Sequence, residues 1–474
     1  MHTIDYRSSL IIVLLLLLTA CGSSPGATVA PIETEGAALL PTPTDVATAT
    51  TMPTEAVVAT TTPTEVATAT TMPTEAATVT PTEVATATTM PTEAATATVA
   101  ALAPSASMGA RLLFLSGGNL VAFDLQRATQ NEVVSGVDAF AATTDGRRLA
   151  LVRAEGREVW VAAPDGSGLQ RVLRSEQFVS DLSWNPDGTT LVYTAAATPA
   201  PFPPQHQAWS EWCSGAEARI YDLERDNGLS LGQGCQPAFG PDGLRIVFAS
   251  PPQEVSPGLG FLSAVNTIQM VNQQGENSWS VAQALGTVGE DGLLVYAPSW
   301  SPNSGQVAYQ RFLGYQALVD INITERSSSY QVDPTPLTVD AGWGFAPVYA
   351  PEGQRMAVVT YNYSDARGFS GYDLWRVNLL DLTEGSEAFL PSGTVRVAAR
   401  TLAVVNGATA AAWAPDGATL ALVLPAGWRA ELDPMVPQFP EVGPGEVWQW
   451  HAERGAERKL AEGVDYGSPL VWLP

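Results

Sequence analysis

A five-residue sequence motif recurs in the second part of the chain, and this repeat constrains the fold more than any other feature. Each copy has an aromatic residue, a small or polar residue, proline, an acidic or amide residue, and glycine or serine. The copies lie at residues 184–188, 239–243, 300–304, 349–353 and 413–417, and a degenerate copy lies at 143–146. An alternating apolar strand starts three residues after each copy. Proline fixes φ and glycine supplies positive φ, so each copy predicts a strand, a tight turn and a second strand.

A third strand follows the second in every repeat. It begins with an apolar residue and usually ends on a polar one, at residues 159–161, 220–222, 268–270, 318–320, 374–376 and 447–449. Turn residues and a short fourth strand come next. Each repeat is therefore predicted to be one small antiparallel sheet of four strands, and serial units of this kind are typical of repeat folds.

This repeat resembles that of the TolB-like, WD-related β-propellers, whose signature is an aromatic residue followed by Ser-Pro-Asp-Gly and an apolar strand. The resemblance covers residues 109–474, and six variants in one chain make it far more specific than a single match. It implies an all-β propeller. TolB itself has six blades behind a globular α/β domain, and this chain has no such domain, so TolB's partnership with the Tol-Pal system is not carried over.

The two ends of the repeat region predict the number of blades. Residues 471–474 are an aromatic strand that stops where its turn should begin, and residues 109–114 have the spacing of the strand that follows such a turn. One blade is therefore predicted to be shared between the two ends, which removes free sheet edges. Together with six whole blades, this predicts a single seven-bladed propeller.

The first 20 residues have the pattern of a signal peptide. Arg7 precedes an apolar stretch from Leu10 to Leu18, which is too short for the roughly 20 residues that cross a bilayer. Residues 18–22, Leu-Thr-Ala-Cys-Gly, resemble the bacterial lipobox, and this implies cleavage before Cys21 and diacylation of its thiol. Because two acyl chains anchor a protein stably, we expect an extracytoplasmic, membrane-anchored lipoprotein. An ordinary signal peptide that ends near a cysteine is the alternative.

Residues 21–108 are predicted to be the lipidated cysteine and a disordered linker. Pro-Thr-Glu recurs in this Thr/Ala/Pro-rich segment, which has no Lys, Arg or aromatic residue after Cys21. Such a segment cannot bury enough apolar surface to offset chain entropy. Only residues 109–474 are expected to form a core.

Charge and motif content exclude several function classes. The chain has 48 acidic residues against 23 Lys and Arg, and a net charge of −25, which argues against nucleic-acid binding. The three His and three Cys form no sequence-local metal cluster of the C-x-x-C or H-E-x-x-H kind. We therefore predict no metal, no cofactor and no catalytic residue that the sequence identifies.

The repeats differ mainly in the loop between the second and third strands, so function is expected there. The loops are long at residues 194–219, 250–267, 361–373 and 425–446, and all emerge on one face. The repeated aromatics of the turns are interpreted as core, and the repeated Asp as a turn former. The candidate ligand-binding aromatics stand instead in or beside the long loops: Trp209, Trp212, Phe261, Tyr361, Tyr363, Phe369 and Trp428.

We expect these rings to flank a trough that crosses the face from the fifth blade toward the first and second. The partner would be a protein or a polysaccharide. The alternative to an open trough is that these rings fold down and pack over the blades as core. An alternative function is an extracytoplasmic glycan hydrolase or lyase that uses loop carboxylates, although nothing in the sequence pairs them. The candidate carboxylates are Glu211, Glu254, Asp365, Asp373, Glu431 and Asp433.

Cys213 and Cys235 are the cysteines that remain after lipidation. Cys213 lies late in a long loop and Cys235 in the connection to the next blade, so both reach the same face. A compartment that permits oxidation makes a disulfide between them plausible. Two free thiols are the alternative.

Overall fold

The structure is a computed structural model. It describes residues 111–202, 206–255, 263–287, 293–313, 317–323, 335–340, 342–362, 374–390, 393–429 and 444–473. All of these belong to the second of the two units into which the chain divides, Met1–Thr96 and Ala97–Pro474. Cys21, the predicted signal peptide and the whole of the predicted linker lie outside the described residues.

The described strands form seven antiparallel sheets of four or five strands, which we number 1 to 7 in chain order. Sheet 1 contains β1 (Arg111–Ser116), β2 (Asn119–Asp124), β3 (Thr129–Val134) and β32 (Val471–Leu473). Sheet 2 contains β4 (Ala139–Ala142), β5 (Leu149–Arg153), β6 (Glu158–Ala162) and β7 (Gln170–Arg174). Sheet 3 contains β8 (Phe178–Trp184), β9 (Thr190–Ala196), β10 (Ala216–Asp222) and β11 (Asn227–Gln233).

The remaining sheets follow the same order with additions. Sheet 4 contains β12 (Cys235–Phe239), β13 (Arg245–Ala249), β14 (Gln253–Val255), β15 (Ser263–Asn272) and β16 (Trp279–Thr287). Sheet 5 contains β17 (Leu293–Trp300), β18 (Gln306–Leu313), β19 (Ala317–Ile323) and β20 (Pro336–Asp340). Sheet 6 contains β21 (Trp343–Gly344), β22 (Val348–Tyr349), β23 (Arg355–Asn362), β24 (Leu374–Asp381) and β27 (Arg400–Asn406). Sheet 7 contains β28 (Ala410–Trp413), β29 (Thr419–Pro425), β30 (Pro444–His451) and β31 (Gly455–Asp465).

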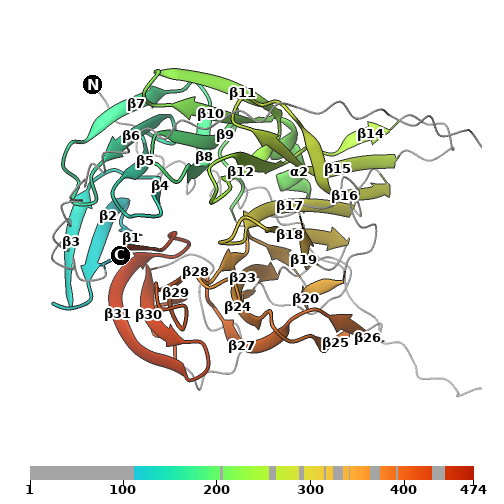
Figure 1. The fold of residues 1–474 in the computed structure, drawn as a ribbon. Helices are drawn as coiled ribbons and strands as arrows, with labels where there is room; N and C mark the ends of the chain where they lie inside the picture. The colour runs from blue at the N-terminus through green and yellow to red at the C-terminus, as the bar shows by residue number, and fades with distance from the viewer. Residues whose placement is uncertain are drawn as a thin grey trace, which may run out of the picture. The chain divides into compact units, whose positions relative to one another are not determined.

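The sheets form a closed ring, as Figure 1 shows. Each sheet contacts the next one along the chain, and sheet 7 contacts sheet 1 through β31 and β1. Sheet 1 joins the two ends of the described region, because β32 pairs with β1 in the register Leu112 to Trp472. The fold is thus an all-β propeller, as the repeat predicts, and the blade shared between the ends is confirmed.

The count of regular blades is six, one fewer than the seven predicted, although seven sheets have at least four strands. Sheet 6 is the least regular. Its inner position is divided between β21 and β22, each two residues long, and a separate hairpin of β25 (Ser386–Leu390) and β26 (Gly393–Val397) precedes its last strand. The number of blades therefore stays a prediction.

The recurring turns have the predicted geometry. In the copy at 185–188, the Gly188 amide donates to the Asn185 carbonyl at 3.1 Å, and Gly188 has a φ of 70°. The Asp187 carboxylate accepts the Thr189 amide at 2.9 Å, which confirms its role as a turn former. Even Ser304, which replaces glycine in one copy, has a φ of 57°.

The repeated tryptophans join neighbouring sheets. Each indole Nε1 donates to a carbonyl on the inner strand of the preceding sheet, and the acceptor lies one residue before the equivalent position there. The pairs are Trp184 to Ala141 at 3.3 Å, Trp300 to Ala238 at 3.1 Å, Trp413 to Val348 at 3.0 Å and Trp472 to Ala412 at 2.9 Å. The repeated aromatics are buried, so their interpretation as core residues is confirmed.

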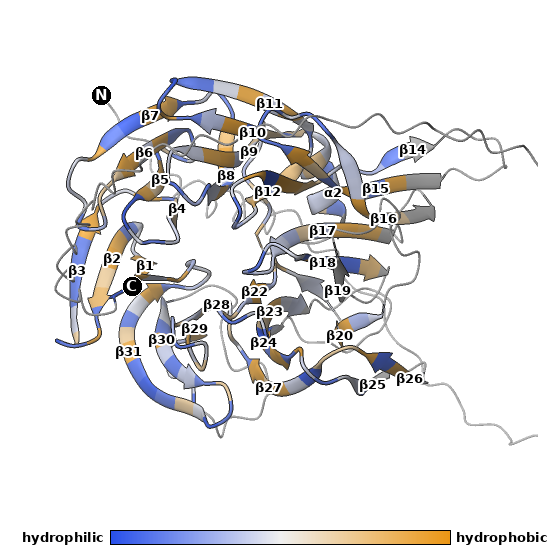
Figure 2. Cartoon of the chain, in the orientation of Figure 1, coloured by the Kyte–Doolittle hydropathy of each residue, from blue (hydrophilic) through white to orange (hydrophobic). Residues whose placement is uncertain are grey.

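Burial falls from the inner and middle strands to the outer ones. β1 is almost wholly buried, whereas β3 exposes four of its six residues and is strongly hydrophilic in Figure 2. Among the described residues there is one helix, α2 (His206–Ser214), between β9 and β10. Within the described part of the chain, no helix is both long and apolar enough to cross a membrane.

Candidate functional site

The long segment between β9 and β10, which we call the sheet 3 insertion (residues 197–215), is the most elaborate feature that departs from the repeat. Its helix α2 carries an i,i+4 pair, in which the Gln207 side-chain amide donates to Glu211 at 2.9 Å. The helix ends where the Gly215 amide donates to the Trp212 carbonyl at 3.1 Å. The insertion lies on the face where the loops between second and third strands emerge.

A disulfide fixes the end of this helix. Cys213 in α2 is bonded to Cys235 at the start of β12, with an S–S distance of 2.13 Å, and both residues are fully buried. The bond therefore attaches the sheet 3 insertion to the inner strand of sheet 4. The predicted disulfide is confirmed.

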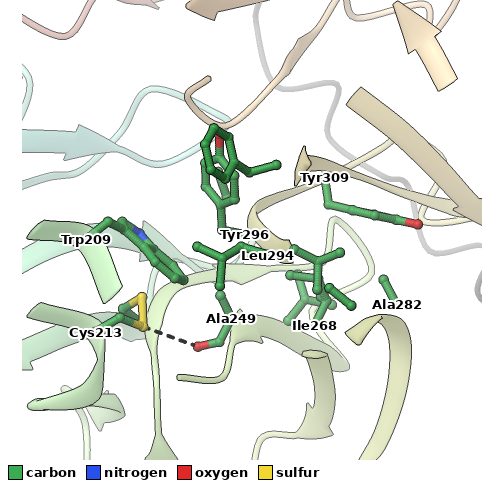
Figure 3. Close-up of a cluster of buried hydrophobic side chains, with 14 of the residues drawn as sticks. Trp209, Cys213, Ala249, Ile268, Ala282, Leu294, Tyr296 and Tyr309 are labelled. Carbon is green, nitrogen blue, oxygen red and sulfur yellow. Dashed lines mark hydrogen bonds between the residues drawn. A yellow bond between two sulfur atoms is a disulfide. The ribbon is translucent and has the colours of Figure 1, made fainter. Parts of the chain in front are cut away.

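Trp209 extends the contacts of α2 to two further sheets, and Figure 3 shows its ring beside Tyr296. Its ring centroid lies 5.4 Å from that of Tyr296 in sheet 5 and 5.7 Å from that of Trp343 in sheet 6. Tyr296 and Trp343 stack on one another at 3.9 Å, and the Gly344 amide donates to the Tyr296 hydroxyl at 3.0 Å. The helix is thus anchored by an aromatic layer as well as by the disulfide.

The first part of the insertion reaches the opposite side of the ring. Phe202 stacks on Trp375 of sheet 6, with ring centroids 5.3 Å apart. A methyl group on Gly467, in the connection from sheet 7 to sheet 1, would come within 2.7 Å of the Phe202 ring. The insertion therefore contacts sheet 6 and the sheet 7 to sheet 1 connection as well as sheets 4 and 5.

These contacts correct the predicted trough. The insertion of the third sheet crosses the path along which a low channel was expected between the fifth sheet and the first two. The four described candidate rings are also buried, with exposed fractions of 1% for Trp209, 6% for Trp212, 4% for Tyr361 and 9% for Trp428. Trp209, Tyr361 and Trp428 pack against other aromatic rings, and Trp212 packs within a hydrophobic cluster, because burial of large apolar rings is more favourable than their exposure.

The other candidate rings are not placed. Phe261, Tyr363 and Phe369 lie outside the described residues. The rings of the trough prediction that are described thus form core, which was its alternative. Ligand binding by the face as a whole is not tested by this finding.

A polar network that the sequence did not reveal links the inner strands of sheets 3, 4 and 5. Asp181, Gln236 and Ala297 occupy the same repeat position and have φ values of 50°, 56° and 51°. Each lies at a β-bulge, where an extra residue re-aims the strand. The only sequence signal is the shared offset of three residues before the recurring aromatic, and no glycine marks it.

Hydrogen bonds connect these bulges in series. The Ala297 amide donates to the Gln236 side-chain oxygen at 2.9 Å, and the Gln236 amide donates to the Thr194 hydroxyl at 2.9 Å. The Thr194 hydroxyl donates in turn to Asp181 at 2.7 Å. Burial raises the pKa of Asp181, against the lowering effect of the hydroxyls of Thr194 and Ser180 and the Gln236 amide.

Asp181 keeps an exposed surface although atoms of the protein surround it closely. One such carboxylate can hold a proton or accept hydrogen bonds. It does not by itself make the pair of groups that general acid and base catalysis needs.

Most of the candidate carboxylates for the alternative function, a glycan hydrolase or lyase, lie outside the described residues. Glu211 is exposed on α2 and bonded to Gln207. Glu254 lies in β14, and Asp365, Asp373, Glu431 and Asp433 fall outside the described residues. In the described ranges, no group of three or more His, Cys, Asp or Glu is placed to hold a metal ion. The enzyme alternative is not tested by these positions.

Comparisons with known proteins identify no family for this chain. No family model matches the chain, and no curated protein matches it. Among solved structures, the chain is similar to the tricorn protease (11% identity, 77% of this chain and 34% of that one, TM-score 0.46). It is similar to TolB from Acinetobacter baumannii (11% identity, 75% and 79%, TM-score 0.37). It is also similar to the Cps50 (Swd1) β-propeller domain from Myceliophteria thermophila (12%, 70% and 88%, TM-score 0.41). The chain thus spans about a third of the tricorn protease.

Proposed function

We propose that the protein is a membrane-anchored extracytoplasmic lipoprotein whose seven-bladed propeller is a binding module for a protein or polysaccharide partner. The observation that carries the binding role is the sheet 3 insertion. It departs from the repeat, and a disulfide and an aromatic layer hold it in one arrangement. A pre-ordered surface of this kind binds without the entropy loss of ordering a mobile loop. We propose binding and not catalysis as the role of this face.

Seven blades are proposed because seven sheets of at least four strands contact one another in a closed series. The Trp472 indole supports this reading of the shared blade. It makes the same inter-sheet hydrogen bond as Trp184, Trp300 and Trp413, which lie at the inner strands of whole sheets.

Capture with the purified full-length chain tests the binding role. The chain would be offered the proteins and the polysaccharides of its own cell surface, in parallel with a variant that lacks residues 198–212 and keeps the disulfide. We expect the intact chain to retain one partner at least 10-fold better than the deletion variant. Equal retention by both, with both chains folded by circular dichroism, would rule out the insertion as the binding surface.

The proposed lipid anchor is tested separately, by substitution of Cys21. Cys21→Ser removes the thiol that the lipobox resemblance assigns to diacylation. We expect labelling with a radioactive fatty acid to be abolished, and the chain to accumulate as uncleaved precursor or as a released form. Unchanged labelling of the serine variant would contradict the anchor.

A further inference from the structure

Phe202, in the sheet 3 insertion, is an exposed ring that covers a buried one. Its side chain is 54% exposed, yet it covers the indole of Trp375, which is 4% exposed. Trp375 is also packed by Phe345 at 5.2 Å and Tyr361 at 4.9 Å. The ring of Phe202 is thus the outermost member of an aromatic cluster that is otherwise fixed to sheet 6.

The space that Phe202 occupies depends on the absence of a neighbouring side chain. Gly467 has a φ of 117°, and a Cβ atom there would lie 2.7 Å from the Phe202 ring. The nearby Tyr466 hydroxyl is engaged, because it donates to the Gly407 carbonyl at 2.8 Å. The described neighbours of Phe202 include the Trp375 indole and the Gly467 backbone, which together form an apolar seat for its ring.

The sequence around Phe202 indicates which kind of ligand the seat accepts. Residues 199–204 read Pro-Ala-Pro-Phe-Pro-Pro. Proline-rich segments adopt extended polyproline II structure with little entropy loss, and they dock on clusters of aromatic side chains. The chain thus places Phe202, which follows Pro201, on an aromatic cluster of its own propeller.

We propose that the Trp375 cluster is a binding site for an extended, proline-rich peptide that carries an aromatic residue, and that Phe202 occupies this site in the free protein. This inference rests on the proposed binding role and names the partner's chemistry as a protein segment. The internal segment competes with the partner because both need the same face of Trp375. A tethered competitor acts at an effective concentration on the order of millimolar.

The experiment measures binding of a synthetic peptide with the sequence of residues 198–207 to the full-length chain, by calorimetry and by tryptophan fluorescence. Phe202→Ala should empty the seat. We expect this variant to bind the peptide with a Kd at least about 10-fold lower than the wild-type chain, which still carries its internal competitor. A peptide in which the phenylalanine is replaced by alanine should not bind either chain.

Controls separate a binding site from a packing contact. Leu244→Ala removes another exposed apolar side chain, 66% exposed in a recurring turn, and should leave peptide binding as in the wild type. If the folded Phe202→Ala variant binds no peptide, or binds both peptides equally, the proposal is overturned. In that case, continued capture of a partner by the wild-type chain would leave the broader binding role intact. Binding of a polysaccharide that competes for the seat, without peptide binding, would also overturn it.

Discussion

At the residue scale, the same position of the repeat carries different chemistry in different sheets. Trp413 donates its indole N–H to the Val348 carbonyl at 3.0 Å, whereas the buried hydroxyl of Tyr349 has no hydrogen-bond partner among the residues that the structure describes. Burial raises the pKa of Tyr349, because the ionised phenol would lose its hydration there. One ring therefore joins two sheets through a polar contact, and the other contributes packing alone.

This contrast gives a matched pair of substitutions. Trp413→Phe removes the inter-sheet hydrogen bond and some ring volume, so we expect a loss of about 1–3 kcal/mol of unfolding free energy. Tyr349→Phe removes a hydroxyl that is buried without a partner, so its effect should be neutral or stabilising. Urea denaturation of both variants compares them. A larger loss of unfolding free energy for Tyr349→Phe than for Trp413→Phe would contradict these roles of the two rings.

Asp181 predicts a pH dependence whose sign follows from its raised pKa. Folding favours the protonated carboxyl, so the folded state holds more protons than the unfolded state above about pH 4. The contribution of Asp181 to stability is therefore present at low pH and is lost as pH rises through the folded-state pKa. The turn carboxylates Asp187 and Asp416, whose pKa values are lowered, act in the opposite direction below about pH 4.

Asp181→Asn keeps a hydrogen-bond acceptor and removes the charge. We expect its melting temperature at pH 7 to exceed that of the wild type by about 1–2 °C, and this difference to shrink toward pH 4. Calorimetry across that range is the measurement. Asp181→Ala is the control, because it removes the acceptor for Thr194 and should not be stabilising. An asparagine variant that is less stable at pH 7 would refute the sign.

At the element scale, the disulfide is the covalent link between the sheet 3 insertion and sheet 4. It closes a segment with a sequence separation of 22 and is fully buried. Cys213→Ser with Cys235→Ser should lower the unfolding free energy by about 3 kcal/mol on the loop-entropy estimate. Mass spectrometry of the denatured, alkylated wild-type chain should find neither cysteine modified. Full alkylation of both, or an unchanged stability of the double variant, would show that the bond does not form.

The elements also show how far the sequence could predict the fold. The strands and turns could be predicted from the Pro-Asp-Gly motif, because local chemistry alone sets a turn such as that at Gly188. The blade shared between the ends could be predicted from the spacing of the first and last strands relative to that motif. The bulges at Asp181, Gln236 and Ala297 could not be predicted, because the positive φ is imposed by pairing and by hydrogen bonds between sheets.

The insertion aromatics show the same limit at the candidate site. The sequence located Trp209 and Trp428 in long loops, but loop position does not decide whether a ring faces water or a neighbour. Trp209 is buried because Tyr296 and Trp343, from two other sheets, offer a surface for it. Phe202, a member of the same insertion, is the exposed ring, and only its contacts with Trp375 and Gly467 distinguish it.

At the scale of the whole molecule, stability depends on ring closure by a very short strand. β32 has three residues, and it pairs with β1 while the Trp472 indole donates to Ala412 of sheet 7. Leu473 is 2% exposed within the cluster that it shares with Leu113 and Leu149. The closure thus combines backbone pairing, one inter-sheet hydrogen bond and burial of apolar side chains.

Deletion of residues 471–474 should therefore open the ring. Loss of the buried Leu473 side chain, of the partly buried Trp472 ring and of the pairing with β1 should cost about 5 kcal/mol or more, a large part of the stability of a typical domain. The freed edge of β1 can pair with other chains, so we also expect aggregation. Thermal melts with light scattering measure both effects. Trp472→Phe, which keeps the strand and loses the indole hydrogen bond, should stay monomeric with a smaller loss. A truncated chain that melts like the wild type and remains monomeric would show that closure does not hold this propeller together.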